Sequence, residues 1–277
     1  MQLDEKWFLQ IADDDETRSR LAEIFSLRKK VLAQNSFEGD TARFLLKLGG
    51  HFVLFDMRSS LSAIETYQEI FLHRGHRTID GFDGKDASVV FDIGANRGFY
   101  SLAIRESNKT AVIYAFEPNP VEYGFLNEHV KLNSMEPVVV LQCAVEDRAG
   151  ESWIDYVPEV GTIGGKKMLQ TSRPWMKKDF YRRIRVQSVT LDDTVRKYGL
   201  ERIDILKIDT EGMEAEILGS STLEFASRVV VEYHCPSVRN ELISIMTGKD
   251  FELAGEDAGQ GRYYGDLYFT RMEKGKE

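Results

Sequence analysis

The chain has 277 residues, of which 42% are hydrophobic, and this is enough apolar material to bury the core of one large or two small domains. Its 45 acidic and 36 basic residues give a formal net charge of −9, which argues against general binding to nucleic acid or to an anionic membrane. Two cysteines cannot form a disulfide framework, the first residues lack a signal-peptide pattern, and no apolar run approaches the ~20 residues of a membrane helix. We therefore expect a soluble protein of the cytoplasm.

Residues 1–80 predict a mainly helical cap that packs on the rest of the chain, because no linker rich in Gly, Ser or Pro follows them. Thr17–Gln34 has apolar residues at helical spacing, with acids before it and bases near its end, the charge order that a helix dipole favours. Thr41–Leu48 predicts a second, short helix that ends at Gly49. Phe52–Phe55 then predicts a strand, and Ser60–His73 a further helix.

Residues 81–277 predict an α/β domain, because short runs rich in Val and Ile alternate with helical stretches. Such alternation indicates a mostly parallel sheet with helices on both faces. The tail, Phe251–Thr270, has two strand-like runs joined by a glycine-rich stretch, so we expect an antiparallel pair at the sheet edge. The expected strands are Val89–Ile93, Ala111–Phe116, Val138–Gln142, Ile203–Ile208, Val229–His234 and Tyr264–Thr270, and the expected helices between the first of them are Tyr100–Ser107 and Pro120–Asn133.

The most informative string is Val89–Gly98, an apolar strand that runs into Asp92 and then into a turn with Gly94 and Gly98. Ligands of parallel sheets bind beyond the carboxyl ends of strands, and glycines there let the backbone approach closely. The turn lacks one glycine of the dinucleotide pattern G-x-G-x-x-G, and its spacing differs. A carboxylate at Asp92 would repel a pyrophosphate and suits an ammonium group, such as that of an amino-acid tail.

A second acid, Glu117, ends the next strand at about the ~20-residue spacing of an acid that binds ribose hydroxyls. The small residues Cys143 and Ala144 follow the third strand and suit the edge of a flat adenine slot. Each feature alone is common at helix caps, surfaces and strand–helix corners. In this order, after successive strands, they favour a ligand that joins a nucleoside to an amino acid, and S-adenosylmethionine is that ligand.

Five strings in order closely resemble the motif series of the FkbM family of S-adenosylmethionine-dependent methyltransferases: Asp92–Gly98, Phe116–Asn119, Cys143–Asp147, Val189–Asp193 and Ile205–Gly212. The resemblance extends over about residues 60–235. It implies a Rossmann-like class I methyltransferase domain with a seven-stranded, mostly parallel sheet whose last strand is antiparallel. It also implies S-adenosyl-L-methionine as cofactor and methylation of a hydroxyl of a small molecule, sugar or glycolipid. The residues then expected to bind the cofactor are Asp92, Gly94, Ala95, Asn96, Gly98, Tyr100, Ser101, Glu117, Pro118, Asn119, Ala144 and Asp209.

Carboxylates and a histidine end two further strands. Asp209 and Glu211 follow the fourth expected strand, and Glu232 and His234 end the fifth, where residues two apart share a face. One of these four could remove the proton of a substrate hydroxyl, since histidine is the usual base near neutral pH and a carboxylate can orient it. The four are therefore the expected catalytic residues, and the sequence does not decide which of them is the base.

The same residues allow two other interpretations. In a structural one, Asp209 caps the next helix, Lys207 pairs with Glu232 or Asp92, and His234 bonds a backbone carbonyl. In the other, the carboxylates bind a divalent cation, but their spacing is irregular and we expect no metal. The string Asp209–Gly212 also differs from the Asn/Asp-Pro-Pro-aromatic motif of many methyltransferases that act on amino groups, which favours an oxygen acceptor.

A basic insert at residues 157–186 interrupts this acidic chain. Lys166–Arg185 contains eight bases and one acid, with aromatic residues such as Trp175 among them. The insert is either a solvated surface or a lid over an anionic acceptor, such as an acidic sugar, a lipid phosphate or RNA. An RNA 2′-O-methyltransferase is thus an alternative function, which the overall charge opposes. A nicotinamide oxidoreductase and a non-catalytic nucleotide-binding module are further alternatives.

Overall fold

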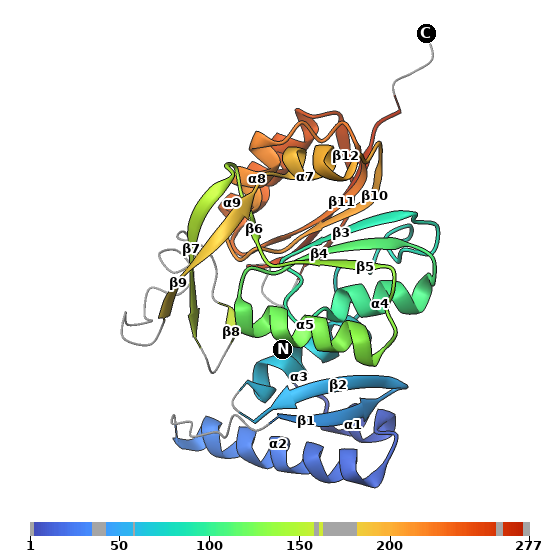
Figure 1. Ribbon diagram of the computed structural model, residues 1–277, viewed down its shortest axis with the longest axis vertical. Coiled ribbons are helices and arrows are strands. Elements are labelled where there is room, and N and C mark those ends of the chain that lie inside the picture. The colour runs from blue at the N-terminus through green and yellow to red at the C-terminus, as the bar shows by residue number, and fades with distance from the viewer. Residues whose placement is uncertain are drawn as a thin grey trace.

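A seven-stranded sheet forms the centre of the computed structural model, which describes residues 3–34, 43–57, 59–157, 161–162, 182–258 and 263–273 (Figure 1). Its strands, in spatial order, are β12 (Phe251–Ala258), β13 (Gly265–Arg271), β11 (Ala226–Tyr233), β10 (Ile203–Ile208), β3 (Val89–Ile93), β4 (Val112–Phe116) and β5 (Val138–Leu141). The pairs from β11 to β5 are parallel, and β13 runs antiparallel to both of its neighbours. The expected Rossmann-like class I sheet with an antiparallel last strand is therefore confirmed.

Helices cover both faces of this sheet. α4 (Phe99–Ser107) and α5 (Pro120–Leu132) lie on one face, and α7 (Leu191–Tyr198), α8 (Glu214–Ser220) and α9 (Pro236–Thr247) lie on the other (Figure 1). Neighbouring residues of β3 accordingly belong to different clusters: Val90 packs with α4, whereas Phe91 packs with α7 and α8. Burial on both faces explains why these strands read as continuous apolar runs.

The N-terminal part consists of α1 (Glu5–Ile11), α2 (Asp15–Gln34), β1 (Arg43–Leu48), β2 (His51–Asp56) and α3 (Ser60–Phe71). One hydrophobic cluster joins it to the sheet, with Phe8 and Tyr67 on one side and Val90 and Phe99 on the other. The segment therefore packs on the helical layer beneath the sheet, and its boundary at residue 80 stays a prediction.

The helix expected over Thr41–Leu48 is wrong. Residues 43–48 form strand β1, which pairs antiparallel with β2. Leu46 and Leu48 are fully buried while Leu45 and Lys47 are exposed, which is the two-residue period of a half-buried strand. Gly49 and Gly50, with φ of +58° and +84°, form the turn of the hairpin and not a helix end.

A second, smaller sheet was not expected. Its order is β6 (Ala144–Val145), β9 (Arg182–Val189), β7 (Gly150–Val157) and β8 (Gly161–Thr162). Arg183 of β9 donates two hydrogen bonds to the Asp155 carboxylate, at 2.7 and 2.8 Å, and Arg185 pairs with Glu151 at 3.3 Å. Two bases of the basic insert thus have acidic partners within the sheet, and residues 163–181, including the proposed lid, lie outside the described residues.

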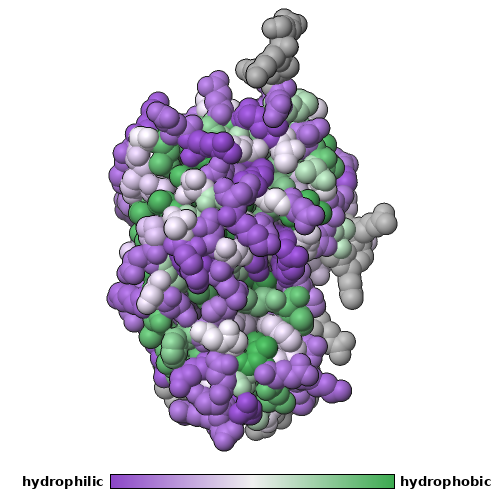
Figure 2. All heavy atoms as spheres, turned by 90° about the vertical axis from the view of Figure 1, so that its right-hand side faces the viewer, coloured by the Kyte–Doolittle hydropathy of each residue, from purple (hydrophilic) through white to green (hydrophobic). Residues whose placement is uncertain are grey.

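Hydrophilic residues cover most of the face that lies on the right of Figure 1, and apolar groups appear there as small scattered patches (Figure 2). None of the helices in the described ranges is long and apolar enough to span a membrane.

Candidate active site

The turn after β3 places two glycines in the left-handed region, with φ of +74° at Gly94 and +81° at Gly98. A Cβ on Gly94 would overlap the backbone oxygen of Asp209, and one on Gly98 would overlap the side chain of Leu126. Both glycines are thus required by close packing within the chain, in addition to any approach of a ligand. Gly94 also joins the ends of β3 and β10, since it touches the residue that follows β10.

Backbone hydrogen bonds tie this turn to the end of β4. The N–H groups of Gly94 and Ala95 donate to the carbonyl of Phe116, at 3.1 and 2.9 Å. Glu117 accepts from the N–H of Asn96 and from that of Asn119, each at 2.8 Å. Burial raises the pKa of the Glu117 carboxyl to about 8, although these two bonds favour its ionised form. Turn and acid therefore form one preorganised unit.

Asp92 is fully buried and already has partners. The hydroxyl of Ser101 donates to its carboxylate at 2.7 Å, and the Lys207 ammonium lies 3.1 Å away. Lys207 also donates to the carbonyl of Gly94 at 2.8 Å. Burial opposes the charge of Lys207, but Asp92 and Asp209 raise its pKa above the usual value. The Lys207–Asp92 pair of the structural interpretation is therefore present, and the contact of Asp92 with a cofactor ammonium stays a prediction.

The other expected cofactor residues lie in three places: Ala95 is in the turn, Pro118 and Asn119 follow β4, and Ala144 is in β6 of the small sheet. Ala95, Asn119 and Ala144 are buried, and Pro118 is half-buried. Asn119 caps α5 by accepting from the N–H of Val121 at 3.0 Å. The hydroxyl of Tyr100 is buried without a hydrogen-bond partner among the described residues, so it is free to meet a ligand.

The four expected catalytic residues gather at the ends of β10 and β11. The His234 Nε2 atom lies 3.5 Å from a carboxylate oxygen of Glu211 and 3.5 Å from one of Glu232. One donor atom each of Asp209, Glu232 and His234 lie within 4.8 Å of one another. The topology thus brings together residues that the sequence placed on separate strands.

Their charges differ because their neighbours differ. Burial would raise the pKa of Asp209, but the ammonium of Lys207 holds it below the usual range, so Asp209 is ionised at neutral pH. Burial and the neighbouring carboxylate of Asp209 raise the pKa of Glu232 well above its usual value. Asp209 therefore ionises more readily than Glu232, and Glu232 holds its proton to a higher pH than an ordinary glutamate.

Asp209 does not cap the next helix. A carboxylate oxygen of Glu214 instead accepts from the N–H groups of Thr210 and Gly212, at 2.9 and 3.0 Å, and from the Thr210 hydroxyl at 3.0 Å. That structural interpretation is wrong, because the loop is organised from within α8. The Asp209 side chain instead meets the carboxyl group of Glu232, whose hydrogen bond favours the ionised form of Asp209.

Sequence reasoning missed two residues here. The Nδ1 atom of His76 lies 2.8 Å from a carboxylate oxygen of Asp266, and its Nε2 atom lies 3.7 Å from Asp209. Asp266 carried a signal, since it is an acid within the apolar strand β13, where it is 7% exposed. His76 carried none, because it lies in the turn after α3, outside any strand end.

Comparison with known proteins bears on this arrangement. The family model described as "Methyltransferase FkbM domain" matches residues 92–253, more than half of the chain. The chain belongs to the FkbM methyltransferase family. It is an S-adenosylmethionine-dependent methyltransferase, and the expected family, enzyme class and cofactor are confirmed.

Three proteins that are similar to this chain are named as methyltransferases. The chain is 29% identical to "Methyltransferase sdnD" of Sordaria araneosa, over 72% of this chain and 86% of that protein. It is 27% identical to the 31-O-demethyl-FK506 methyltransferase FkbM of Streptomyces tacrolimicus, over 69% and 82%. It is also 27% identical to the 2-O-methyltransferase NoeI of Sinorhizobium fredii, over 57% and 68%. Both of the latter names specify methylation of oxygen.

Asp209, Glu232 and His234 are also the kind of donors that hold a divalent cation. In this member of the FkbM family, however, cations of the chain already oppose the charge of Asp209. The Lys207 ammonium and the His76 imidazole each lie 3.7 Å from the same oxygen, Oδ2. The absence of a metal requirement therefore stays our prediction.

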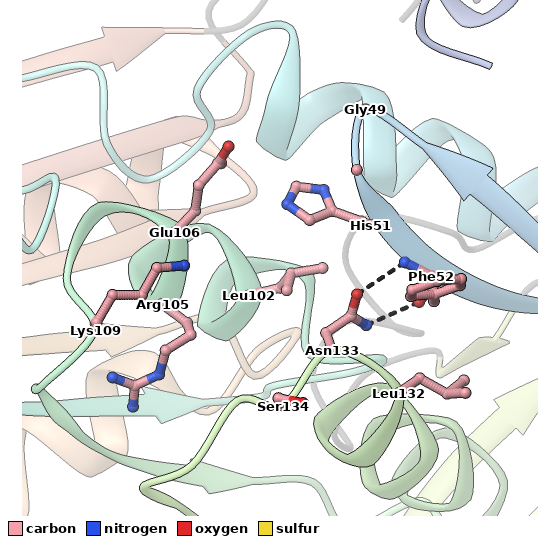
Figure 3. Close-up of a pocket in the computed structure, with 11 residues that line it drawn as sticks. Gly49, His51, Phe52, Leu102, Arg105, Glu106, Lys109, Leu132, Asn133 and Ser134 are labelled. Carbon is pink, nitrogen blue, oxygen red and sulfur yellow. Dashed lines mark hydrogen bonds between the residues drawn. The ribbon is translucent and has the colours of Figure 1, made fainter. Parts of the chain in front are cut away.

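A cavity of about 420 Å³ lies away from these residues, between the β1–β2 turn and the C-terminal ends of α4 and α5 (Figure 3). His51 and Leu102 face one another across it, and the Arg105 guanidinium points away to bond backbone carbonyls such as that of Met135, at 2.8 Å. None of the expected cofactor or catalytic residues lines it. It is therefore not the site of methyl transfer in this fold, whose ligands bind at the carboxyl ends of strands.

Proposed function

We propose that this FkbM-family enzyme transfers a methyl group to a hydroxyl oxygen of a small molecule, sugar or glycolipid. The carrying observation is that an ionised carboxylate, Asp209, lies beside a carboxyl and an imidazole at the sheet edge that holds the cofactor turn. Two relatives are named for 31-O and 2-O methylation, and these names support an oxygen acceptor.

The proposed cofactor side consists of Glu117 for the ribose hydroxyls and the Gly94–Gly98 turn for the amino-acid tail. When bound, S-adenosylmethionine supplies a methyl group on a positively charged sulfur. Alignment of the acceptor oxygen with that methyl can supply as much as ~7–11 kcal/mol of rate enhancement in well-oriented systems. The fixed turn and its bonds to β4 serve this alignment.

On the acceptor side, the Asp209 carboxylate accepts a hydrogen bond from the acceptor hydroxyl. As the oxygen–methyl bond forms and the methyl–sulfur bond breaks, the hydroxyl proton passes to the group of Asp209, Glu232 and His234. Proton transfer to such a positioned group contributes typically ~10²–10⁴-fold to a rate. Glu211 and Glu232, each 3.5 Å from His234, stabilise the imidazolium when that residue holds the proton.

The test is incubation of the protein with labelled S-adenosylmethionine and a panel of polyhydroxylated acceptors, followed by mass spectrometry of the product. The panel contains macrolides, neutral and acidic sugars, glycolipids and a short RNA. Label on a hydroxyl oxygen supports the proposal, and label found only on nitrogen or carbon contradicts it. Transfer to the RNA would favour the alternative 2′-O-methyltransferase.

A finer proposal is that the acceptor is anionic and is bound by the basic insert. The test is a variant in which the charges of Lys177, Lys178 and Arg182 are reversed. Arg183 is kept, because it donates hydrogen bonds to Asp155. We expect a higher acceptor KM with unchanged affinity for S-adenosylmethionine. Reversal of Arg20 and Lys29, exposed on α2, is the matched control. Equal acceptor KM values in both variants would remove the anionic acceptor from the proposal.

A further inference from the structure

The side chain of His76 is held in one orientation by Asp266. One carboxylate oxygen of Asp266 lies 2.8 Å from the His76 Nδ1 atom, and the other accepts from the His76 backbone N–H at 2.9 Å. His76 is 4% exposed, and its φ of +60° is in the left-handed region, which is unfavourable for a residue with a Cβ. The backbone N–H and the ring Nδ1 of this strained, buried histidine both meet one carboxylate. Asp266 therefore stabilises the unfavourable backbone conformation and fixes the orientation of the ring.

Asp266 is itself held by a hydrogen-bonded chain. The hydroxyl of Tyr268 donates to Asp266 at 3.3 Å, and the hydroxyl of Thr78 donates to that of Tyr268 at 3.1 Å. The carboxylate bond at Nδ1 leaves Nε2 as the ring atom that faces the opening, which is the way a carboxylate orients an imidazole in many active sites.

The Nε2 atom of His76 faces Asp209, the one carboxylate within ion-pair distance of that atom in the described part of the chain. It lies 3.7 Å from Oδ2, and the Lys207 ammonium lies 3.7 Å from the same oxygen. Oδ2 thus has two cations beside it, and the carboxyl group of Glu232 is a further hydrogen-bonding neighbour of the Asp209 side chain.

We propose that His76 is a positioning residue for methyl transfer, anchored by Asp266 and acting through Asp209. It lies beside Oδ2 together with Lys207, and these two cationic side chains fix the orientation in which the Asp209 carboxylate meets the acceptor hydroxyl. The inference rests on the proposed function, and it adds that residues before the matched domain, 92–253, complete the site.

Charged and titratable groups reach His76 from every element packed against it. Although burial opposes the charged ring, Asp266 raises the pKa of His76 above its usual value. The groups concerned are Glu69 of α3, Tyr100 of α4, Lys207 of β10, Asp209 after β10 and Asp266 of β13.

The experiment compares His76→Gln, Asp209→Asn and the double variant, with the hydroxyl acceptor that the product analysis identifies. We expect His76→Gln to lower kcat about tenfold, the size typical of one member of a coupled polar network, with unchanged S-adenosylmethionine affinity by calorimetry. The double variant should be no slower than Asp209→Asn alone. If the fold-decrease of kcat in the double variant equals the product of the two single decreases, His76 does not act through Asp209, and the inference is overturned.

His129→Gln is the matched control, because His129 is also buried, at 1% exposure, but bonds the carbonyl of Arg97 and the N–H of Leu54. We expect it to lower Tm without changing kcat of the folded protein. If His76→Gln behaves in the same way, its role is only structural. The wild-type protein distinguishes the proposed O-methylation from the positioning role of His76. If the wild type does not methylate oxygen, the proposed function is refuted, and the contact of His76 with Asp209 is tested by spectroscopy.

A spectroscopic measurement tests the contact without an acceptor. In ¹⁵N-resolved NMR of the full chain, the pH midpoint of the His76 imidazole should fall in Asp266→Asn and in Asp209→Asn, because each variant removes a carboxylate that favours the charged ring. The His76→Gln spectrum assigns the signal. A midpoint that is unaffected by Asp209→Asn would contradict the inference.

Discussion

The proposed cofactor side and the proposed acceptor side of the active site are built differently. On the cofactor side, the turn of Gly94–Gly98 and the end of β4 hold each other by backbone hydrogen bonds. On the acceptor side, ionisable side chains from separate segments meet, and each charge depends on its neighbours. We infer from this difference that cofactor binding depends on backbone geometry at the strand ends. Proton transfer from the acceptor depends instead on the packing of segments that are far apart in the sequence.

The largest effect is expected where the two sides touch. Gly94→Ala would place a Cβ on the backbone oxygen of Asp209, at a φ of +74°. Overpacking and backbone strain should together lower the free energy of unfolding by about 3 kcal/mol or more. Gly50→Ala is the control, because its φ of +84° is similar but no atom lies within 4 Å of the added Cβ. Urea denaturation giving equal losses for both would show that the close contact is unimportant.

A large effect confined to turnover is expected from the acceptor side. His234→Ala should lower kcat about 100-fold, since a positioned proton acceptor is lost. Affinity for S-adenosylmethionine, measured by calorimetry, should be retained. A parallel loss of cofactor affinity would show that the two sides are not separable in the way described.

The reverse result is expected from the cofactor side. At pH 9, where the carboxylate is ionised, Glu117→Ala should weaken S-adenosylmethionine binding roughly 30-fold, in the range for lost hydrogen bonds to a charged group. The kcat at saturating cofactor should change little. Glu128→Ala, on the partly exposed side of α5, provides the control in calorimetry. Unchanged affinity in Glu117→Ala would remove Glu117 from the ribose site.

A smaller effect follows from the pKa of Glu117, which burial raises to about 8. Below that pH the carboxyl keeps its proton, and above it the carboxylate can accept from both ribose hydroxyls, so cofactor affinity should rise between pH 6 and 9. The same shift means that the folded free enzyme binds this proton more tightly than the unfolded chain. Its contribution to stability is therefore full at low pH and is lost as pH rises through about 8. Glu117→Gln should flatten both profiles in calorimetry and in thermal melts.

The smallest effect is expected from removal of metals. Because Lys207 and His76 already oppose the charge of Asp209, dialysis against EDTA should leave kcat unchanged. Loss of turnover that Mn²⁺ or Mg²⁺ restores would instead assign Asp209, Glu232 and His234 to a metal site.

Most of the sheet could be predicted because its signals are local. Val89–Ile93 and Ile203–Ile208 were placed to the residue, since each is an apolar run bounded by polar turns. The Thr41–Leu48 segment was not, because five apolar residues in a short run fit both a helix and a strand, and pairing with β2 decided for the strand. The small sheet of β6 to β9 was missed because its strands carry alternating charges and pair across the basic insert.

The sequence alone indicated most strands of the central sheet in chain order, the glycine turn, the acid that follows it and the family, because all of these are properties of contiguous residues. Only the tertiary structure decided that His76 meets Asp266, 190 residues away, and that both face Asp209. It also decided which carboxylate ionises more readily, since the pKa values of Asp209 and Glu232 depend on burial and on charges from other segments. Contacts between residues so far apart in the sequence form only when the strands assemble into the sheet, and no local sequence pattern encodes them.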